Sequence, residues 1–298
     1  MRNYAPILLF TYARLFSLKR LVSSIKKNKG FYNHELFIFS DGPKNKKDKK
    51  QIYKVRKYIK SINGFKKITI FKNKRNLGTA KSIINGVNKI IKIKKMAIIL
   101  EDDLILNENF LDYMNNSLKK YKHSKKVWHV SGWNYNFNFK INSSDAFFSR
   151  HMMCWGWATW YNKWRHFKKE PKRLIKNWTK KKIKKFNLDD SYNFWSQVIR
   201  NNNNKINTWA IFWYATIFEN KGLCLYPKGS LVLNLGNDRF AVNTQKNSII
   251  NNRNFKKNGK IKVFPRKVQE NETALKTIKS NLKPNILKKI IKRIKDDK

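Results

Sequence analysis

The chain has 298 residues, with 67 lysines and arginines against 18 acidic residues and a net charge of +49 at pH 7. Apolar residues make up 41% of the sequence, which excludes a disordered chain and allows one large domain or two small ones. Such a charge attracts phosphates and anionic lipid surfaces. The lysines are scattered over nearly every segment, however, so composition alone does not indicate a nucleic-acid reader.

The amino-terminal apolar run and the two cysteines bear on the cellular location of the protein. MRNYAPILLFTYARLF has a short apolar stretch interrupted by Arg14 and no small-residue cleavage site, which predicts a strand and turn rather than a signal peptide. No stretch approaches the ~20 apolar residues that a spanning helix needs. Cys154 and Cys224 have no metal-ligand or redox spacing and are interpreted as core thiols. We therefore expect a cytoplasmic protein.

Up to about residue 103, short apolar runs alternate with segments of helical periodicity. Strands are predicted at Ile7–Thr11, Leu36–Ser40, Ile68–Phe71 and Met96–Leu100. The apolar residues between these runs recur at helical spacing, which predicts a helix in each interval. The fold class predicted is α/β, with a mostly parallel central sheet and helices on both faces.

Polar residues follow each predicted strand, at the sheet edge where open α/β folds bind ligands. In chain order these loops are residues 11–14, 41–43, 75–78 and 101–103. Taken singly, the second is a turn signal and the third a helix entry. Their joint placement at one edge favours a ligand site.

The fourth loop, Glu101-Asp102-Asp103, is the most informative feature of the chain. Adjacent carboxylates repel one another, so their placement after a buried strand indicates a hard cation or a polar ligand. Mg²⁺ or Mn²⁺ fits, because either ion needs only one or two protein carboxylates when phosphates supply its other oxygens. In transfer from a nucleotide sugar, such an ion neutralises the charge that develops on the departing diphosphate.

Beyond residue 103 the pattern predicts a helix at 110–118 and short strands at 127–131 and 146–149. An aromatic-rich region follows, and its rings are interpreted mainly as core, with a few expected to contact sugar or base. These rings are Trp155, Trp157, Trp160, Tyr161, Trp164, Trp195, Trp209, Trp213 and Tyr214.

The chain becomes polar and basic after about residue 245. Apolar residues between Ile286 and Ile294 share one face of a predicted helix whose other positions are basic. Such a helix binds an anionic membrane, or docks on the domain or on a partner. We therefore predict a domain of residues 1–245, with a nucleotide-binding half (1–105) and an acceptor half (106–245), and a basic helical tail (246–298). The tail suggests peripheral association with the inner membrane.

Six stretches carry a resemblance to a known family. They are PILLFTYAR, IFSDGP, NKRNLGTAKSI, AIILEDDLILNENFLDYM, VSGWN and FFSRHMMCWGWATW. Over about residues 5–240 they resemble bacterial cytoplasmic glycosyltransferases related to the N-acetylglucosaminyltransferase I family. The resemblance implies the nucleotide-sugar transferase A-type fold, a UDP-sugar as the first choice of donor, Mn²⁺ or Mg²⁺ as cofactor, and a glycan or lipid-linked acceptor.

Carried over by position, the resemblance also implies roles for residues. Asp103 matches the metal ligand, and Glu101 and Asp102 match residues that contact the donor sugar and ribose. Asp41 matches the position that recognises the base, and Arg14 lies in the loop that surrounds the nucleotide.

Three further positions follow from the same resemblance. Arg75 and Lys81 are expected to reach the diphosphate. The pair Gly156-Trp157 matches a segment that lines the donor and acceptor pocket.

The general base is where the sequence departs from the family. The stretch Thr208–Trp213 has no acid where the family places an aspartate beside a tryptophan, and an inverting transferase needs such a carboxylate. Asp189, Asp190, Glu219 and Asp238 are the candidates, and Asp238 is favoured because it lies in a glycine-containing loop that could close over the site. Equally, Asp238 is explained as a loop cap, Asp190 as a helix cap, and Glu219 as the partner of a lysine.

The sequence thus predicts a metal-dependent hexosyl- or N-acetylhexosaminyltransferase for a cell-surface polysaccharide, a lipopolysaccharide or a lipid-linked oligosaccharide. The alternatives are a nucleic-acid-binding protein and a transferase homologue that binds the donor without turnover. A two-metal nuclease or phosphotransferase is ranked last, because few acids remain to build its second metal site.

Overall fold

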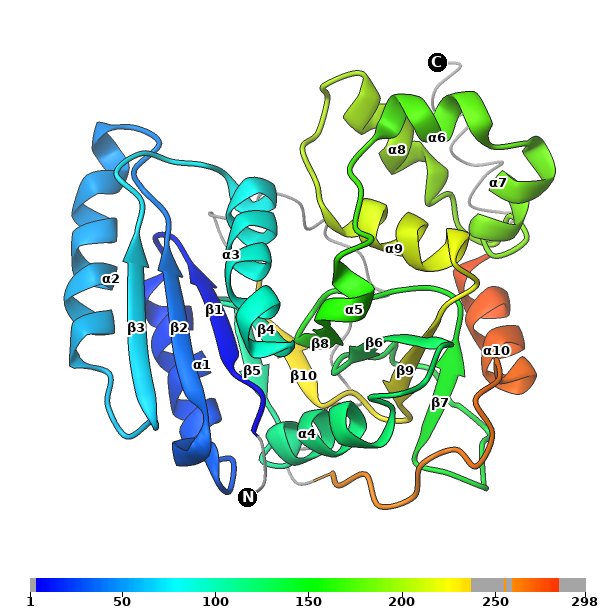
Figure 1. Ribbon diagram of the computed structural model, residues 1–298, viewed down its shortest axis with the longest axis horizontal. Coiled ribbons are helices and arrows are strands. Elements are labelled where there is room, and N and C mark those ends of the chain that lie inside the picture. The colour runs from blue at the N-terminus through cyan, green and yellow to red at the C-terminus, as the bar shows by residue number, and fades with distance from the viewer. Residues whose placement is uncertain (1–3, 237–254, 256–258, 284–298) are drawn as a thin grey trace, which may run out of the picture.

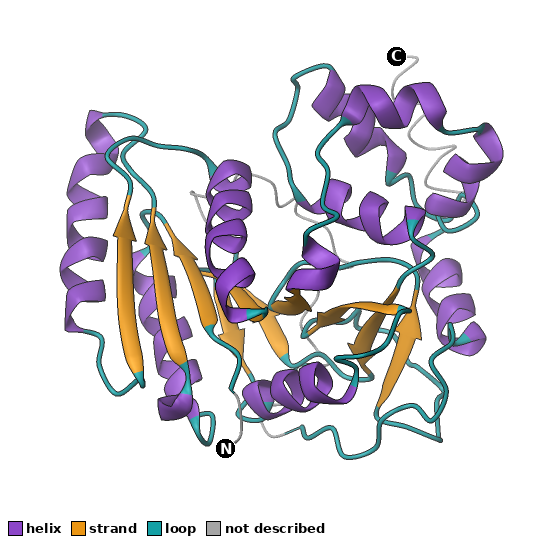
Figure 2. Ribbon diagram, viewed as in Figure 1, coloured by secondary structure: helices purple, strands orange, loops and turns teal. Residues whose placement is uncertain are grey.

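The computed structural model of the protein describes residues 4–236, 255 and 259–283. Its centre is a sheet with strand order β3-β2-β1-β4-β8-β6-β9-β7, flanked by helices (Figures 1 and 2). The strands are β1 (Ile7–Thr11), β2 (Glu35–Ser40), β3 (Lys67–Lys72), β4 (Met96–Glu101), β6 (Val127–Ser131), β7 (Ala146–Ser149), β8 (Trp157–Trp160) and β9 (Leu223–Pro227).

Strands β1 to β4 form a parallel half, in which Ile7 of β1 lies opposite Leu36 and Ile98. All five residues of β1 are buried, as expected for an apolar strand covered on both faces. In the other half, β7 and β8 run against the remaining strands. The predicted α/β class with a mostly parallel sheet is therefore confirmed.

Three helices connect the parallel strands. They are α1 (Leu15–Lys26), α2 (Lys49–Ser61) and α3 (Thr79–Lys94), and two short 3₁₀ turns lie at Phe31–Asn33 and Lys46–Asp48. Helices α1 and α2 contact each other, whereas α3 packs on β1 and β4. Because such crossovers are right-handed, the reversal of strand order after β3 places α3 on the opposite face.

A separate two-stranded ribbon joins distant parts of the chain. Strand β5 (Leu104–Leu106) pairs antiparallel with β10 (Val232–Asn234), so Leu104 lies opposite Asn234. Strand β5 starts three residues after β4 ends, so the acidic triplet spans the junction between the sheet and the ribbon.

The second half of the chain adds helices around the aromatic residues. They are α4 (Phe110–Lys120), α5 (Tyr161–Trp164), α6 (Pro171–Asn177), α7 (Lys180–Phe186), α8 (Trp195–Asn202) and α9 (Ala210–Glu219). The rings of Trp157, Trp164 and Trp213 are fully buried, which confirms the interpretation of these aromatic residues as core.

Part of the predicted basic tail belongs to the folded domain. Helix α10 (Glu272–Leu282) contacts β7 and buries Ala274 and Ile278, and an ion pair of 2.6 Å joins Arg150 to Glu270. The predicted amphipathic helix of residues 286–294 lies outside the described residues. Within the described ranges, no helix has the length and apolarity needed to cross a membrane.

Candidate functional site

The carboxyl ends of β1 and β4 are joined through Asp102. Its Oδ2 accepts hydrogen bonds from Thr11 Oγ1 at 2.8 Å and from the backbone N–H of Tyr12 at 2.9 Å. Asp102 is 6% exposed, so these contacts fix its orientation. Thr11 and Tyr12 lie in a loop that the sequence placed at the site, but nothing in the pattern singled out their bonds to Asp102.

Asp103 is held by Arg14. The Arg14 Nη1 lies 2.7 Å from Asp103 Oδ2 and 3.7 Å from Asp102 Oδ1, with both ends of the pair largely shielded from solvent. Helix α1 begins directly after Arg14, which sets the direction in which this side chain leaves the end of β1. The structure thus brings together three residues that the sequence assigned to one site.

The ribbon covers the other side of Asp103. The Asp103 carbonyl accepts a 2.8 Å hydrogen bond from the backbone N–H of Leu235. A β-carbon placed on Gly236 would lie 2.5 Å from Asp103 Oδ2 and 2.8 Å from Asn234 Oδ1. Only glycine therefore fits at position 236 without displacing the carboxylate. The sequence analysis noted Gly236 in a loop but did not connect it with the acidic triplet.

The acidic residues strongly perturb one another. Burial, followed by the charges of Asp103 and Asp102, raises the pKa of Glu101 from 4.5 to about 8. Burial and the charge of Asp103 raise the pKa of Asp102 to about 6, against the opposing hydrogen bonds and Arg14. Arg14 therefore does not compensate its three carboxylate neighbours, and groups perturbed in this way are concentrated at functional sites.

These residues fit one mode of cation binding. The described part of the chain contains no cluster of three histidine, cysteine or acidic side chains that could hold a metal ion by themselves. Asp103, at the end of a strand, offers one carboxylate in a region of excess negative charge. A Mg²⁺ or Mn²⁺ ion bound through one carboxylate and the oxygens of a diphosphate needs no more from the protein.

Asp41 ties the second loop to the third. Its carboxylate accepts hydrogen bonds from the backbone N–H groups of Gly42, Leu77 and Gly78 and from Asn73 Nδ2, at 2.9–3.1 Å. These contacts hold the loop after β2 against the loop after β3. Recognition of the base by Asp41 stays a prediction, since the contacts seen are structural.

An arginine that the sequence analysis did not single out also holds the loops after β2 and β3 together. Arg56 of α2 donates to the carbonyls of Asp41 at 3.2 Å and Asn73 at 2.6 Å. Gly42 is needed here too, because a β-carbon on it would lie 2.4 Å from the Arg75 carbonyl carbon. The Arg75 and Lys81 side chains are exposed at this edge, and their predicted contact with a diphosphate stays a prediction.

The Gly156-Trp157 pair is placed differently from the expectation. Gly156 adopts a φ of +63° and its carbonyl accepts a 2.7 Å bond from the Gly132 N–H. The Trp157 ring is 0% exposed and stacks between His129 and Trp209. This ring belongs to the core, and contact with a ligand in the described conformation is excluded by its burial.

The preceding residues lie nearer the acids. Strand β8 begins at Trp157, which pairs with Ile99 of β4; because the two strands are antiparallel, the residues before Trp157 continue toward the carboxyl end of β4. After burial, the charges of Glu101 and Asp103 contribute to the raised pKa of Cys154. Trp155 is partly exposed and packs edge-on against Trp133. Sequence reasoning chose Trp157, and the structure distinguishes the two tryptophans by the full burial of Trp157 and the partial exposure of Trp155.

Within the described residues, none of the four candidate bases lies at the acidic triplet. Asp238 lies outside them. Asp190 is exposed in the turn after α7, where it and Asp189 both have positive φ. Asp189 forms a 2.6 Å ion pair with Lys279 of α10. Helix α8 begins only at Trp195, so Asp190 is not its cap.

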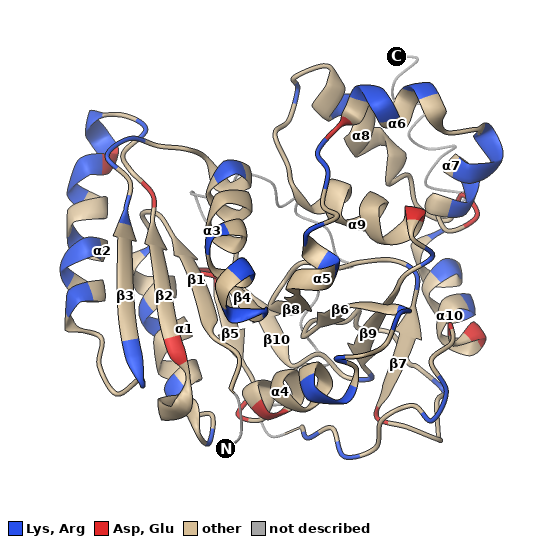
Figure 3. Cartoon of the chain, in the orientation of Figure 1, with Lys and Arg blue, Asp and Glu red and all other residues tan. Residues whose placement is uncertain are grey.

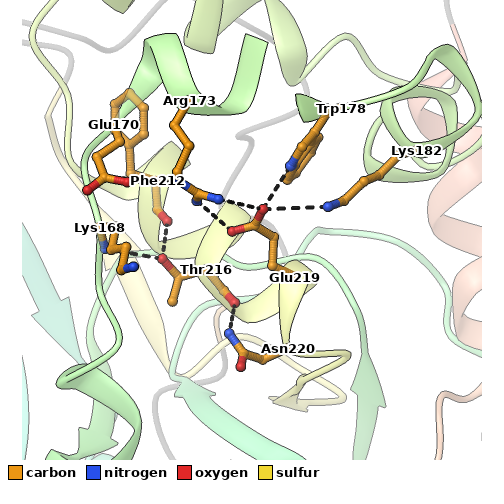
Figure 4. Close-up of polar contacts among 9 residues, drawn as sticks. All are labelled: Lys168, Glu170, Arg173, Trp178, Lys182, Phe212, Thr216, Glu219 and Asn220. Atoms are coloured by element: carbon orange, nitrogen blue, oxygen red, sulfur yellow. Dashed lines mark hydrogen bonds and ion pairs between the residues drawn. The ribbon is translucent and has the colours of Figure 1, made fainter. Parts of the chain in front are cut away.

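Glu219, at the end of α9, lies in a different kind of centre (Figure 4). Arg173 donates to both of its oxygens, at 3.1 and 2.7 Å, and Trp178 Nε1 donates to Oε1 at 2.9 Å. Burial raises the pKa of Glu219, but the hydrogen bonds from Arg173 and Trp178 outweigh it and leave the pKa below 4.5. Glu219 therefore fastens α6 and α7 to α9, and its low pKa does not suit a general base.

Comparison with known proteins gives one family match. The profile of the GNT-I family matches residues 1–189, which contain the sheet ends, Arg14, Asp41 and the acidic triplet. No curated protein matches the chain.

Solved structures of S. aureus TarS share a general likeness with the chain. One is 12% identical with a TM-score of 0.34 and covers 48% of this chain and 24% of its own. The structure of TarS 1-349 is 10% identical with a TM-score of 0.45 and covers 78% of this chain and 60% of its own. The chain therefore corresponds to between about a quarter and three-fifths of these TarS chains.

Proposed function

The chain belongs to the GNT-I family, and from that premise we propose that it is a glycosyltransferase that depends on a divalent cation. The donor proposed is a nucleoside diphosphate sugar, a UDP-sugar in the first place, that supplies a hexosyl or N-acetylhexosaminyl group. The acceptor proposed is a cell-surface glycan or a lipid-linked oligosaccharide.

One observation carries this proposal: three carboxyl groups are crowded at the carboxyl end of β4, and two of them have raised pKa values. Three adjacent carboxyl groups, two of them with raised pKa values, are costly to hold together unless a ligand compensates their charge. A divalent cation with a diphosphate supplies that compensation. The edge at which the residues lie is the one where open α/β sheets bind nucleotides.

Each residue of the site would have a different role in binding the donor. Asp103 would hold the cation, which when bound supplies charge neutralisation to the departing diphosphate. Asp102, oriented by Thr11 and Tyr12, presents its other oxygen as an acceptor for sugar or ribose hydroxyls. Arg14 lies between both carboxylates and offers a fixed positive charge beside the phosphates.

Water exclusion comes from the ribbon and from the loop before β8. Gly236 lies against the Asp103 carboxylate, and the partly exposed Trp155 follows Cys154, whose pKa is raised in part by the charge of Glu101. A shielded carboxylate interacts more strongly with a cation than an exposed one does, because the local dielectric is lower. Deprotonation of the acceptor hydroxyl is proposed to fall to Asp238 or to another carboxylate near the site.

The experiment that tests the proposal is a thermal-shift screen of the full chain against UDP-, GDP-, CMP- and dTDP-sugars. Each is measured with and without Mn²⁺, at a salt concentration that suppresses non-specific phosphate binding. We expect a shift with one nucleotide that requires Mn²⁺. Release of the free nucleotide when acceptor is added then separates a working transferase from a donor-binding homologue.

Two results would contradict the proposal. The first is the absence of a selective shift together with salt-resistant binding to RNA or DNA, which would indicate the nucleic-acid alternative. The second is a selective shift that is the same size without a divalent cation. That result would support binding of the donor but contradict the proposed dependence on a metal ion.

A further inference from the structure

Positive charge is concentrated in one segment of an already basic chain. Residues 161–186 contain twelve lysines and arginines and one acid, Glu170, within 26 residues. Over all 298 residues the net charge is +49, so this segment has more than twice the average charge density. It forms α5, α6 and α7, and Figure 3 shows the basic positions along the outside of α6 and α7.

Six lysines make up this outer surface, which we call the lysine face. They are Lys172 and Lys176 of α6 with Lys180, Lys181, Lys184 and Lys185 of α7. All six side chains are exposed, and none forms an ion pair with a carboxylate of the described residues. Ile175, also exposed, lies among them.

Ion pairs and buried side chains hold in place the two helices that carry the lysine face. The cations that do find carboxylates, Arg173 and Lys182, turn inward to Glu219 (Figure 4). Leu174 and Phe186 are buried beneath the same two helices. The segment therefore separates its cations into an inward set that fastens the helices and an outward set left to solvent.

The side chains of the lysine face favour one class of anionic partner over another. Its aromatic neighbours Trp178 and Phe186 are buried, so no ring is offered for stacking on nucleic-acid bases. Arg173, whose planar group suits fixed phosphates, is turned toward Glu219, and the exposed cations of α6 and α7 are lysines. An array of flexible point charges around an exposed aliphatic side chain suits the mobile headgroups of an anionic bilayer.

The position of the face is also suitable. In Figure 1, α6 and α7 lie at the upper end of the molecule, the end toward which β1, β2 and β3 point. Helix α2 is basic as well, but it runs from that end down the side of the sheet. A surface in contact with the lysine face would therefore lie at the same end as the candidate site.

We propose that the lysine face of α6 and α7 docks the protein on anionic phospholipid membranes. This partner is independent of the chemistry assigned to the acidic triplet. It also differs from binding through residues 286–294, which the sequence analysis considered.

The test measures binding of the full chain to phosphatidylcholine vesicles with and without phosphatidylglycerol, at physiological ionic strength. The variant is Lys180→Gln with Lys181→Gln and Lys184→Gln. The matched control is Lys54→Gln with Lys57→Gln and Lys60→Gln, which removes the same charge from exposed positions of α2. Circular dichroism and Tm establish that both variants fold.

We expect the wild type to bind only vesicles that contain phosphatidylglycerol. Loss of three membrane-facing lysines should weaken that binding on the order of 100-fold, since each contributes about fivefold. The α2 control should change it by no more than about threefold, because charges beyond a Debye length are screened.

Three outcomes would overturn the inference. Equal weakening by the two variants would mean that net charge alone drives binding. Binding to soluble polyphosphate but not to the vesicles would indicate a polyanion instead of a membrane. Full loss of vesicle binding on truncation after Lys283, with the α7 variant unaffected, would assign the contact to the terminal segment.

Discussion

The acidic triplet and Glu219 are two carboxylate centres that each face an arginine at 2.7 Å, yet their electrostatics are opposite. In the triplet, burial and mutual repulsion raise the pKa of Glu101 to about 8 and that of Asp102 to about 6. Around Glu219, Arg173, Trp178 and Lys182 outweigh burial and lower the pKa. Among the described residues, the triplet has one arginine beside three carboxyl groups, whereas the single carboxylate of Glu219 has Arg173 and Lys182.

This difference separates a site that awaits a ligand from a contact that stabilises the fold. A carboxylate surrounded by cations and donors is already satisfied, so its removal should cost stability. Carboxylates that repel one another gain from a bound cation, so their removal should cost binding. An ion pair in a structure is thus not evidence of function unless the neighbouring charges are counted too.

The sharpest test of this contrast is Asp103→Asn. We expect it to abolish Mn²⁺-dependent binding of the donor, a loss of at least ~100-fold, because an amide is a poor replacement for the metal-binding carboxylate. The free energy of unfolding should change by less than about 1 kcal/mol, since relief of repulsion opposes the lost pair with Arg14. Isothermal titration calorimetry with UDP and Mn²⁺ measures the first effect and urea unfolding the second. Unchanged donor affinity would contradict the assignment.

The converse substitution is Glu219→Gln. Because Arg173 and Lys182 lose their charged acceptor, we expect the free energy of unfolding to fall by about 2 kcal/mol. Donor and Mn²⁺ affinity should remain at the wild-type value. Urea unfolding and the same calorimetric titration provide the two readouts. A variant that kept its stability but lost transfer activity would restore Glu219 as a candidate base.

Gly236→Ala tests whether the ribbon positions the triplet. The added methyl group would lie 2.5 Å from Asp103 Oδ2 and must displace it, so we expect Mn²⁺-dependent affinity to fall about tenfold. Gly222→Ala is the matched control, since its methyl group would lie 2.7 Å from Trp128, within a different loop. The control should lower Tm without changing affinity. Equal affinities in the two variants would show that Asp103 tolerates the displacement.

Opposite pKa shifts also predict opposite responses to pH. The raised pKa of Glu101 means that stability falls as the pH rises from 4.5 to about 8, where the buried carboxylate must ionise. The lowered pKa of Glu219 means that its stabilisation is present above pH 4.5 and is lost on acidification through the folded-state pKa. A plot of Tm against pH should therefore decline modestly as the pH rises from 4.5 to about 8 and also as the pH falls below 4.5. Mn²⁺ with UDP should abolish the alkaline decline alone.

The first half of the fold could be predicted because its sequence is locally consistent. Strand β1 occupies the expected residues Ile7–Thr11; β2 and β4 are longer than expected by one residue at one end, and β3 by one residue at each end. Each is an apolar run between polar loops, and the helices between them have one apolar face. The loops at the carboxyl ends were therefore placed at the correct edge.

The sequence of the second half of the fold has weaker helix and strand periodicity, for physical reasons. Residues 211–217 of α9 are all buried, so this helix lacks the apolar stripe that reveals an amphipathic one. Strands β5 and β10 have three residues each, too few to show a period. Their pairing depends on residues more than 120 positions apart, which spacing along a single sequence does not encode.

The candidate site was predicted in part for the same reason. Arg14 and Asp103 lie beside strand ends that the pattern located, and the structure brings them together. The contacts of Thr11 with Asp102 and of Arg173 with Glu219 bridge 91 and 46 residues and carry no sequence signature. Trp155 and Trp157 are two residues apart in the sequence, and only the structure shows that the first is partly exposed and the second fully buried.

The pairing of β5 with β10 also orders events during synthesis. Strands β1 to β4 need only the first 101 residues, so they can form a sheet while the rest of the chain is being made. The support for Asp103 needs Asn234 and Leu235, which leave the ribosome much later. Nascent chains therefore carry the acidic triplet long before they carry its cover, so the proposed donor affinity should appear only after residues 232–236 have been made.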